Sequence, residues 1–235
     1  MPQAGGRKRA SRLMVIPARN LFAVALILGL AGAGCRPGPA RLLPPAEIQD
    51  LKGEASFYLS GPDGAFRFRL GFCCRLSGGV RLELFDPLGR LRTVVWLGGQ
   101  RATLYLPSEK VFWQGDSRVL TSEVFGREIN DEELTGILAG HWTRLADQMG
   151  WKLQLDSQGR VLGGERNGLR FILKEKFSPG LVPRTVHFIY GDYTVRMKVL
   201  RMNFNRCRDD SLFSPALPPV ARELDWEEMA GRWKK

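Results

Sequence analysis

The side chains best suited to chemistry are those of four cysteines and two histidines. Cys35 directly follows the small residues 32–34, which come after a cationic start without acidic residues and an apolar run at residues 21–30. These three parts make up a secretory signal peptide. A cysteine at this junction is the cleavage site of lipoprotein signals, whose thiol first receives a diacylglyceryl group. We therefore predict that residues 1–34 are removed and that Cys35 carries the lipid.

Two other interpretations of this N-terminus remain. The apolar run is shorter than the roughly 20 residues that a membrane-spanning helix needs, so a permanent transmembrane anchor is the weaker one. An ordinary secretory signal followed by a chance cysteine is the other, because Gly32 stands where lipoprotein signals usually carry leucine. Arg36 follows the cysteine; in enteric bacteria an aspartate there retains a lipoprotein in the inner membrane, so Arg36 favours the outer membrane.

The other cysteines are Cys73, Cys74 and Cys207. No CxxC spacing occurs, so the sequence gives little support to a zinc site. Adjacent cysteines in a strand point to opposite faces, so at most one of Cys73 and Cys74 can readily bridge to Cys207. An exported protein can form such a disulfide, and the remaining cysteine would be a small buried apolar residue. Whether the bond forms, and from which cysteine, stays open.

The sequence contains no motif of a serine hydrolase, a zinc protease or a phosphate-binding loop. His141 is expected at a helix end and His187 in a strand, while acidic residues 131–133 suit the first turn of a helix. We therefore expect no enzyme activity, no catalytic residue, no metal and no cofactor.

These residues must be positioned by a chain that is mostly strands. A Pro-rich tether is expected at residues 35–47, and a helix near 119–126 and another at 131–139 interrupt the strand pattern. Many strands joined by short turns form an antiparallel sheet, which must curl or close. About eleven are expected, at residues 53–59, 66–70, 80–85, 91–97, 102–106, 110–113, 151–155, 161–165, 169–176, 184–190 and 193–204.

The whole chain has a formal charge of +11, and the five cationic residues before Cys35 account for part of it, leaving +6 on the mature chain. Basic residues such as Arg67, Arg69 and Arg92 are spread along the strands. A solvated exterior is one explanation, and attraction to an acidic partner or an anionic membrane is the other. Nucleic acid is not an expected partner of an exported protein.

A short helical segment is too little to fill a wide barrel, which leaves room for an apolar cavity inside the sheet. The alternative, which periodicity alone favours, is a barrel filled by its own side chains. The candidates for lining a cavity lie on one face of the strands: Phe57, Phe66, Phe68, Leu70, Leu82, Leu84, Val95, Leu104, Leu106, Phe171, Phe188 and Val195.

The layout resembles the LolB family of outer-membrane lipoprotein receptors, part of a LolA/LolB-like superfamily. The resemblance covers residues 48–206: after the cysteine and the tether come an amphipathic strand pair, a strand ending in Asp86-Pro87-Leu88-Gly89, a mid-chain helix and more strands. The adjacent cysteines and the basic tail, residues 207–235, depart from the family, and the tail is unassigned.

The resemblance implies a mainly β fold, an incomplete antiparallel barrel of about eleven strands with a short α-helical lid over an acyl-chain cavity. It also implies an outer-membrane lipoprotein, anchored in the inner leaflet and facing the periplasm, that takes lipoprotein cargo from a periplasmic carrier. We expect a monomer. Leu88 matches a leucine that contacts the membrane in that family; the alternative is that Leu88 folds back onto the sheet. A protein of the same fold that binds another amphiphile, or assists envelope assembly, is the second hypothesis.

Overall fold

The computed structural model describes residues 41–62, 64–125, 128–178, 180, 182–207 and 209–233. The chain divides into two units, Met1–Gly38 and Pro39–Lys235, and the described residues all belong to the second. The predicted signal peptide and Cys35 lie outside the described residues. The described core, sheet and disulfide all lie after residue 39, so we expect residues 39–235 to fold without the first unit.

Twelve strands form one sheet in the described part of the chain. They are β1 (Asp50–Gly61), β2 (Gly64–Arg75), β3 (Val80–Phe85), β4 (Leu91–Gly98), β5 (Arg101–Leu106), β6 (Val111–Asp116), β7 (Lys152–Leu155), β8 (Val161–Arg166), β9 (Leu169–Lys176), β10 (Pro183–Tyr190), β11 (Tyr193–Phe204) and β12 (Arg222–Glu223). The order across the sheet is β12-β6-β5-β4-β3-β2-β1-β11-β10-β9-β8-β7. The sheet curves but does not close, because β12 and β7 are its two edges.

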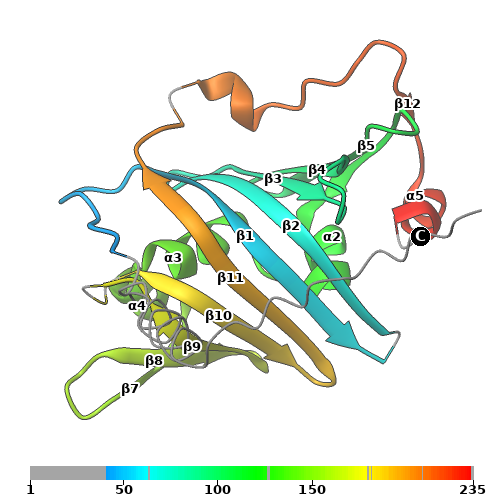
Figure 1. Cartoon of the computed structure of the whole chain (residues 1–235). Helices are drawn as coiled ribbons and strands as arrows, with labels where there is room; N and C mark the ends of the chain where they lie inside the picture. Colours follow the sequence, from blue (N-terminus) through cyan, green and yellow to red (C-terminus); the bar gives the residue numbers. More distant parts are fainter. Residues whose placement is uncertain are drawn as a thin grey trace, which may run out of the picture. The chain divides into compact units, whose positions relative to one another are not determined.

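The helices α2 (Ser117–Phe125), α3 (Asp131–Ala139) and α4 (Trp142–Met149) lie together on one side of the curved sheet, which we call the inner face (Figure 1). A continuous apolar core fills the space between the helices and the inner face. It takes alternate residues from the strands, such as Phe57, Leu70 and Val95, because successive side chains of a strand point to opposite faces. From α3 it takes Leu134, with others of the same helix face.

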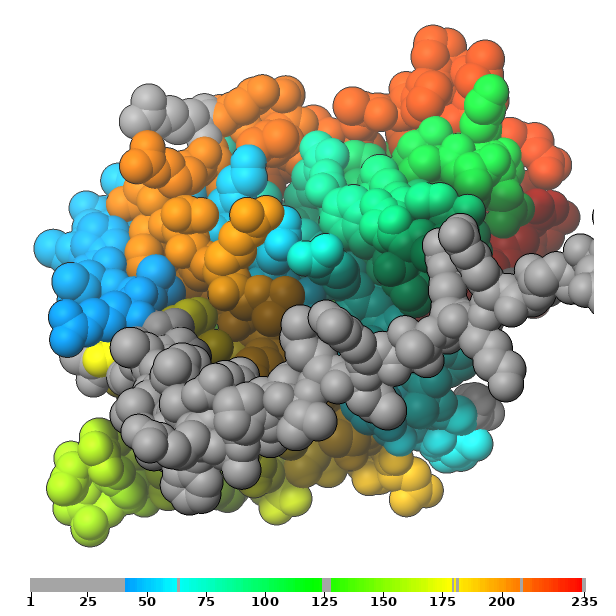
Figure 2. Space-filling view, in the orientation of Figure 1, coloured from blue at the N-terminus to red at the C-terminus, as the bar shows by residue number. Residues whose placement is uncertain are grey.

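The C-terminal tail starts on the opposite side, the outer face, with a 3₁₀ turn, η1 (Asp210–Phe213). It then forms β12 at the edge of the sheet and the helix α5 (Trp226–Trp233), whose Trp226, Met229 and Trp233 pack on the inner apolar core. A second apolar cluster lies under the tail on the outer face: Val94, Trp96 and Tyr105 with Leu91, Phe112, Leu217 and Ala221. Figure 2 shows the orange-red residues of the tail beside the green residues of the sheet. The tail, which the sequence left unassigned, therefore belongs to the same compact unit as the sheet.

The predicted fold class, a mainly β fold that forms an incomplete antiparallel barrel with a short helical lid, is confirmed. The eleven expected strands correspond to β1–β11, although β2 extends past residue 70 as far as Arg75. The expectation of one or two central helices was too low, because α4 follows α3 directly. The strand β12, parallel to β6, was also missed. The end of the expected tether is fixed to the domain, since Leu42 N donates to Ser178 O at 3.0 Å.

Candidate functional site

Two adjoining hollows lie between the sheet and the helices. The inner cavity, of about 80 Å³, is apolar except for one threonine. Its lining comes from β1–β4, β10, β11 and the helices α2, α3 and α5: Phe57, Leu59, Phe68, Leu70, Phe72, Leu82, Leu84, Val95, Leu97, Leu120, Thr121, Leu134, Leu138, Phe188, Met197 and Trp233. The hydroxyl of that threonine, Thr121, already donates to Arg118 O and accepts from Ile129 N, so the space offers little to hold water and suits hydrocarbon.

The second hollow is a larger cleft of about 690 Å³. This volume lies within the range of roughly 300–1,000 Å³ typical of ligand pockets. Leu59, Phe68, Leu84 and Trp233 line both the cleft and the inner cavity, so the two hollows adjoin. The other residues of the cleft are Gly61, Gly64, Phe66, Arg67, Phe85, Asp86, Pro87, Arg92, Thr93, Leu106, Ser108, Glu109, Glu123, Tyr193 and Arg232. The site therefore changes from apolar inside to amphipathic outside.

Nine of the twelve residues expected to line a cavity do so in the structure. They are Phe57, Phe68, Leu70, Leu82, Leu84, Val95 and Phe188 in the inner cavity, and Phe66 and Leu106 in the cleft, with Phe68 and Leu84 in both. Leu104, Phe171 and Val195 instead lie in the closed core, each no more than 2% exposed. The ring of Phe171 lies between Trp142 and Trp151, at centroid distances of 5.8 and 5.2 Å. Helix α4 therefore covers the inner face of the sheet at β9, and no space for a ligand is left beside Phe171.

Several lining residues were not among the candidates. Leu59, Phe72 and Leu97 share the strand face of the predicted residues, and the same alternation could have identified them. Leu134 and Leu138 lie on one face of a helix, which its period of 3.6 could have shown. Nothing in the local sequence places Trp233 in the site, because only the path of the tail brings it there.

The start of helix α3 is fixed to the sheet by its acidic residues, which do more than complement the helix dipole. The side chain of Asp131 accepts hydrogen bonds from Gly79 N (2.9 Å) and Gly99 N (3.3 Å), in the β2–β3 and β4–β5 turns. Asn130 and Glu133 cap the helix reciprocally. Since α3 contributes Leu134 to the inner cavity, these bonds hold one wall of the cavity in place.

The turn between β3 and β4 places Leu88 at its tip, 77% exposed. The side chain of Asp86 accepts from Leu88 N and Arg90 N (both 2.9 Å) and from Arg90 Nε (2.7 Å). These hydrogen bonds, led by that of the Arg90 backbone, hold the pKa of Asp86 below its usual value. Leu88 therefore does not fold back onto the sheet, and it projects beside the cleft that Asp86 and Pro87 border.

The turn between β7 and β8 has the same construction. Asp156 accepts from Gln158 N and Arg160 N (both 2.9 Å) and from Arg160 Nε (2.7 Å). The residue at the position of Leu88 is Gln158, so the turn does not need a leucine to form. The exposed leucine of the first turn consequently has no structural role within that turn.

The basic strand residues differ in their pairing. Arg69 lies 3.6 Å from Glu54, Arg81 lies 2.6 Å from Glu83, and Arg90 pairs with Asp86. Among the described residues no ion pair joins Arg67 or Arg92 to an acid, and both line the cleft. The cleft thus presents cationic groups that a ligand with an anionic head can meet.

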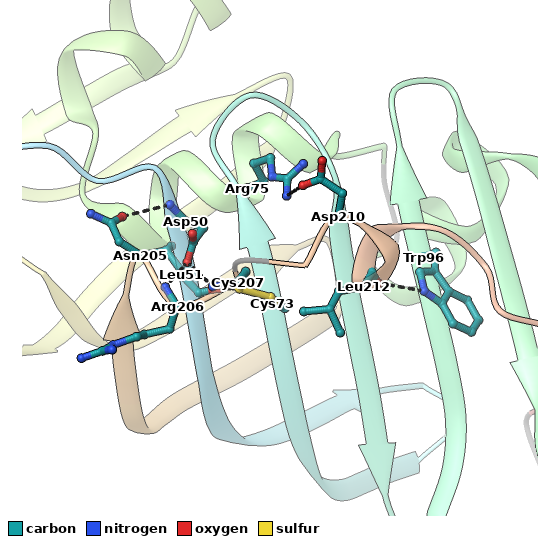
Figure 3. The surroundings of a disulfide bond; sticks show 10 residues. All are labelled: Asp50, Leu51, Cys73, Arg75, Trp96, Asn205, Arg206, Cys207, Asp210 and Leu212. Atoms are coloured by element: carbon teal, nitrogen blue, oxygen red, sulfur yellow. Dashed lines mark hydrogen bonds and ion pairs between the residues drawn. A yellow bond between two sulfur atoms is a disulfide. The ribbon is translucent and has the colours of Figure 1, made fainter.

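A disulfide joins Cys73 of β2 to Cys207, where the tail begins (Figure 3). Beside it, the buried Asp50 accepts from the backbone N–H groups of Arg206 (2.7 Å) and Cys207 (2.9 Å). Cys74 is the free cysteine of the described residues, and burial raises the pKa of its thiol to about 12.

We expect thiol labelling of residues 39–235 to follow this arrangement. The native protein should take up no iodoacetamide, because a buried thiol of such high pKa forms almost no thiolate. The unfolded, unreduced chain should take up one label, and the reduced chain three, since it contains three cysteines after residue 39. Mass spectrometry counts the labels; three labels without reductant would show that the disulfide is absent.

No group of three metal-ligating side chains occurs in the described part of the chain. The pKa of His141 and that of His187 are both lowered, chiefly because burial disfavours the charged imidazole. Neither histidine lines the inner cavity or the cleft. None of the described helices is long and apolar enough to cross a bilayer.

The comparisons with known proteins show similarity of fold alone. No protein-family model and no curated protein sequence matches the chain. A DUF1329 family protein from Desulfovibrio piger ATCC 29098 superimposes with a TM-score of 0.51 at 12% identity, covering 86% of this chain and 99% of its own. A putative outer membrane lipoprotein-sorting protein domain from Vibrio parahaemolyticus matches with a TM-score of 0.48 at 14% identity, covering 72% and 91%. A LolA superfamily protein from Nitrosomonas europaea matches with a TM-score of 0.45 at 10% identity, covering 74% and 92%.

Proposed function

We propose that this protein is an outer-membrane lipoprotein that binds acyl chains in the inner cavity and cleft, and inserts lipoproteins received from a periplasmic carrier into the outer membrane. The observation that carries the proposal is the position of Leu88: an exposed leucine projects beside an amphipathic cleft that adjoins an apolar cavity. Chains held in the hollows would leave at the surface that touches the bilayer.

The chemistry of the two hollows fits an acylated ligand. Hydrocarbon chains gain about 0.8 kcal/mol for each methylene removed from water, so an apolar cavity alone supplies the driving force. The mixed charges of the cleft match the polar part of the ligand, where Arg67 and Arg92 would meet an anionic group. Transfer then follows differences in burial between carrier, receptor and bilayer, and it requires no catalytic residue.

The proposed location rests on the N-terminal sequence. A lipid on Cys35 would anchor the protein, and Arg36 in place of aspartate favours the outer membrane. The described fold begins soon after this cysteine, so the domain would face the periplasm close to the inner leaflet.

A transfer assay tests the proposal. Residues 39–235 are mixed with a fluorescently labelled lipoprotein on its carrier and with liposomes, and label is followed into the protein and then into the liposomes. We expect Leu88→Gln to accept the label like the wild type but to deliver it at least about tenfold more slowly. Burying one leucine in lipid is worth ~1.5–3 kcal/mol, which corresponds to roughly ten- to a hundredfold in docking.

The β7–β8 turn supplies the matched control. Leu88→Gln gives the first turn the residue that the second turn already carries, so its hydrogen bonds and the stability of the protein should not change. Gln158→Ala should accept and deliver label normally. If the wild type never accepts the label, the insertase function is wrong, and binding of another amphiphile by the same fold becomes the leading explanation.

A further inference from the structure

The C-terminal helix α5 reaches both hollows of the site. Trp233, at its end, borders the inner cavity and also the outer cleft. We propose that Trp233 is a removable partition, and that a long acyl chain enters the inner cavity only after the last turn of α5 has moved. This inference rests on the proposed binding of acyl chains, and it assigns to the tail the control of how deep a chain can go.

The start of α5 is firmly anchored. The ring of Trp226 packs on Trp113 of β6 with a centroid distance of 4.7 Å, and Met229 is fully buried. The side chain of Asp225 accepts from Glu228 N at 2.8 Å and caps the first turn. Just before the helix, Leu224 N donates to Phe112 O at 2.8 Å along the edge of the sheet. The tail therefore keeps its attachment to β6 if the last turn moves.

The end of α5 is held less firmly. Arg232 pairs with Glu109 at 2.6 Å on the rim of the cleft, where the two side chains are 38% and 39% exposed. Solvent-exposed pairs of this kind contribute little to stability. An eight-residue helix has little stability of its own and frays readily at its end. The last turn can therefore leave its position without disrupting Trp226 or Met229.

The two hollows differ, so the position of Trp233 should affect long acyl chains more than short ones. The inner cavity, at about 80 Å³, is well below the volume of an ordinary ligand pocket, whereas the cleft, at about 690 Å³, is within that range. A short chain fits in the cleft with the indole in place. The cleft is bordered by charged side chains such as Arg67 and Glu109, so a long chain finds wholly apolar surroundings for its last methylenes only when the two hollows join, and its affinity then depends on the position of Trp233.

The test compares octanoate and palmitate as competitors of the apolar fluorophore N-phenyl-naphthylamine on residues 39–235. We expect Trp233→Ala to lower the Kd of palmitate about tenfold and to leave that of octanoate within about twofold, because only the longer chain gains room for further methylenes. Arg232→Glu, which repels Glu109, should tighten palmitate relative to octanoate by about two- to fivefold, since the added charge repels both carboxylates alike. The charge-swapped double variant, with Glu109→Arg added, should restore the wild-type value.

Leu217→Ala serves as the control in the tail, because Leu217 packs on the outer face and lines neither hollow. Equal changes for both fatty acids, or no change for palmitate, would overturn the partition while the proposed function stands. If neither acid displaces the fluorophore from any variant, the binding function itself is wrong. Should Trp233→Ala unfold, the charge reversal and its restoration decide, since they leave the apolar contacts intact.

Discussion

Glu133→Gln is expected to lower the free energy of unfolding by about 2–4 kcal/mol, whereas Glu132→Gln, one residue earlier, should cost less than about 1 kcal/mol. Both glutamates lie in the first turn of α3 and both pair with an arginine at 2.8 Å. They differ in burial: the side chain of Glu133 is 0% exposed, and that of Glu132 is 43% exposed.

The large effect follows from the number of donors that converge on Glu133. Its two oxygens accept from Trp151 Nε1 (2.8 Å), from Asn130 N (3.0 Å) and from Arg166 Nη2 (2.9 Å), and Arg166 Nη1 forms an ion pair with it at 2.8 Å. A glutamine offers one acceptor oxygen and turns an NH₂ group toward the remaining donors. The substitution thus leaves buried donors unsatisfied and the charge of Arg166 without its partner.

Urea unfolding followed by circular dichroism measures both variants. Glu132→Gln removes the ion pair to Arg144, but Arg144 keeps its hydrogen bond to Leu76 O (3.0 Å) and stays partly in water. The small loss expected there is the internal control for a charge change in the same helical turn. Equal losses in the two variants would mean that the buried cluster does not stabilise the lid more than an exposed pair does.

The sheet could be predicted from the sequence because its signals are local. Alternation of apolar and polar residues marks strands such as β2, β3 and β11, continuous apolar runs mark β4 and β5, and turns such as Asp86–Arg90 close by hydrogen bonds within a few residues. The same alternation identified most of the strand residues that line the hollows. Asn130 and its acidic neighbours likewise indicated the start of α3 before any tertiary contact was known.

Of the missed elements, helix α4 does carry a local signal, because Trp142, Leu145 and Met149 recur at helical spacing and pack on the core. The other missed elements lack one. The strand β12 contains two residues, and the tail touches the outer cluster through isolated side chains such as Leu217. Which half of the inner face stays open depends on Trp142 and Trp151 covering Phe171, and Trp233 enters the site only because the tail passes round the sheet. Such long-range contacts determine which residues line the site, and no short segment of the sequence predicts them.

Replacement of both Cys73 and Cys207 by alanine is expected to lower the free energy of unfolding by about 2–4 kcal/mol. The disulfide closes a loop with a sequence separation of 134 residues, and cross-links across long loops restrict the unfolded chain most. The bond also fixes the start of the tail, whose next contacts are the ion pair of Arg75 with Asp210 (2.6 Å) and the hydrogen bond from Trp96 Nε1 to Leu212 O (3.2 Å; Figure 3).

Reductant provides the control for the disulfide variant. Unfolding of the wild type in dithiothreitol should approach that of the double variant, and the variant itself should not respond to reductant. Because Asp50 still accepts from the backbone N–H groups of Arg206 and Cys207, we expect the sheet to remain folded and the loss to appear first as loosening of the tail. A larger increase in hydrogen exchange over the wild type across residues 209–233 than in β1 would show this. Because Trp226 and Met229 hold the start of α5 independently of Cys207, palmitate binding should not change on reduction, and tighter binding by the reduced protein would mean that the start of the tail also holds its far end.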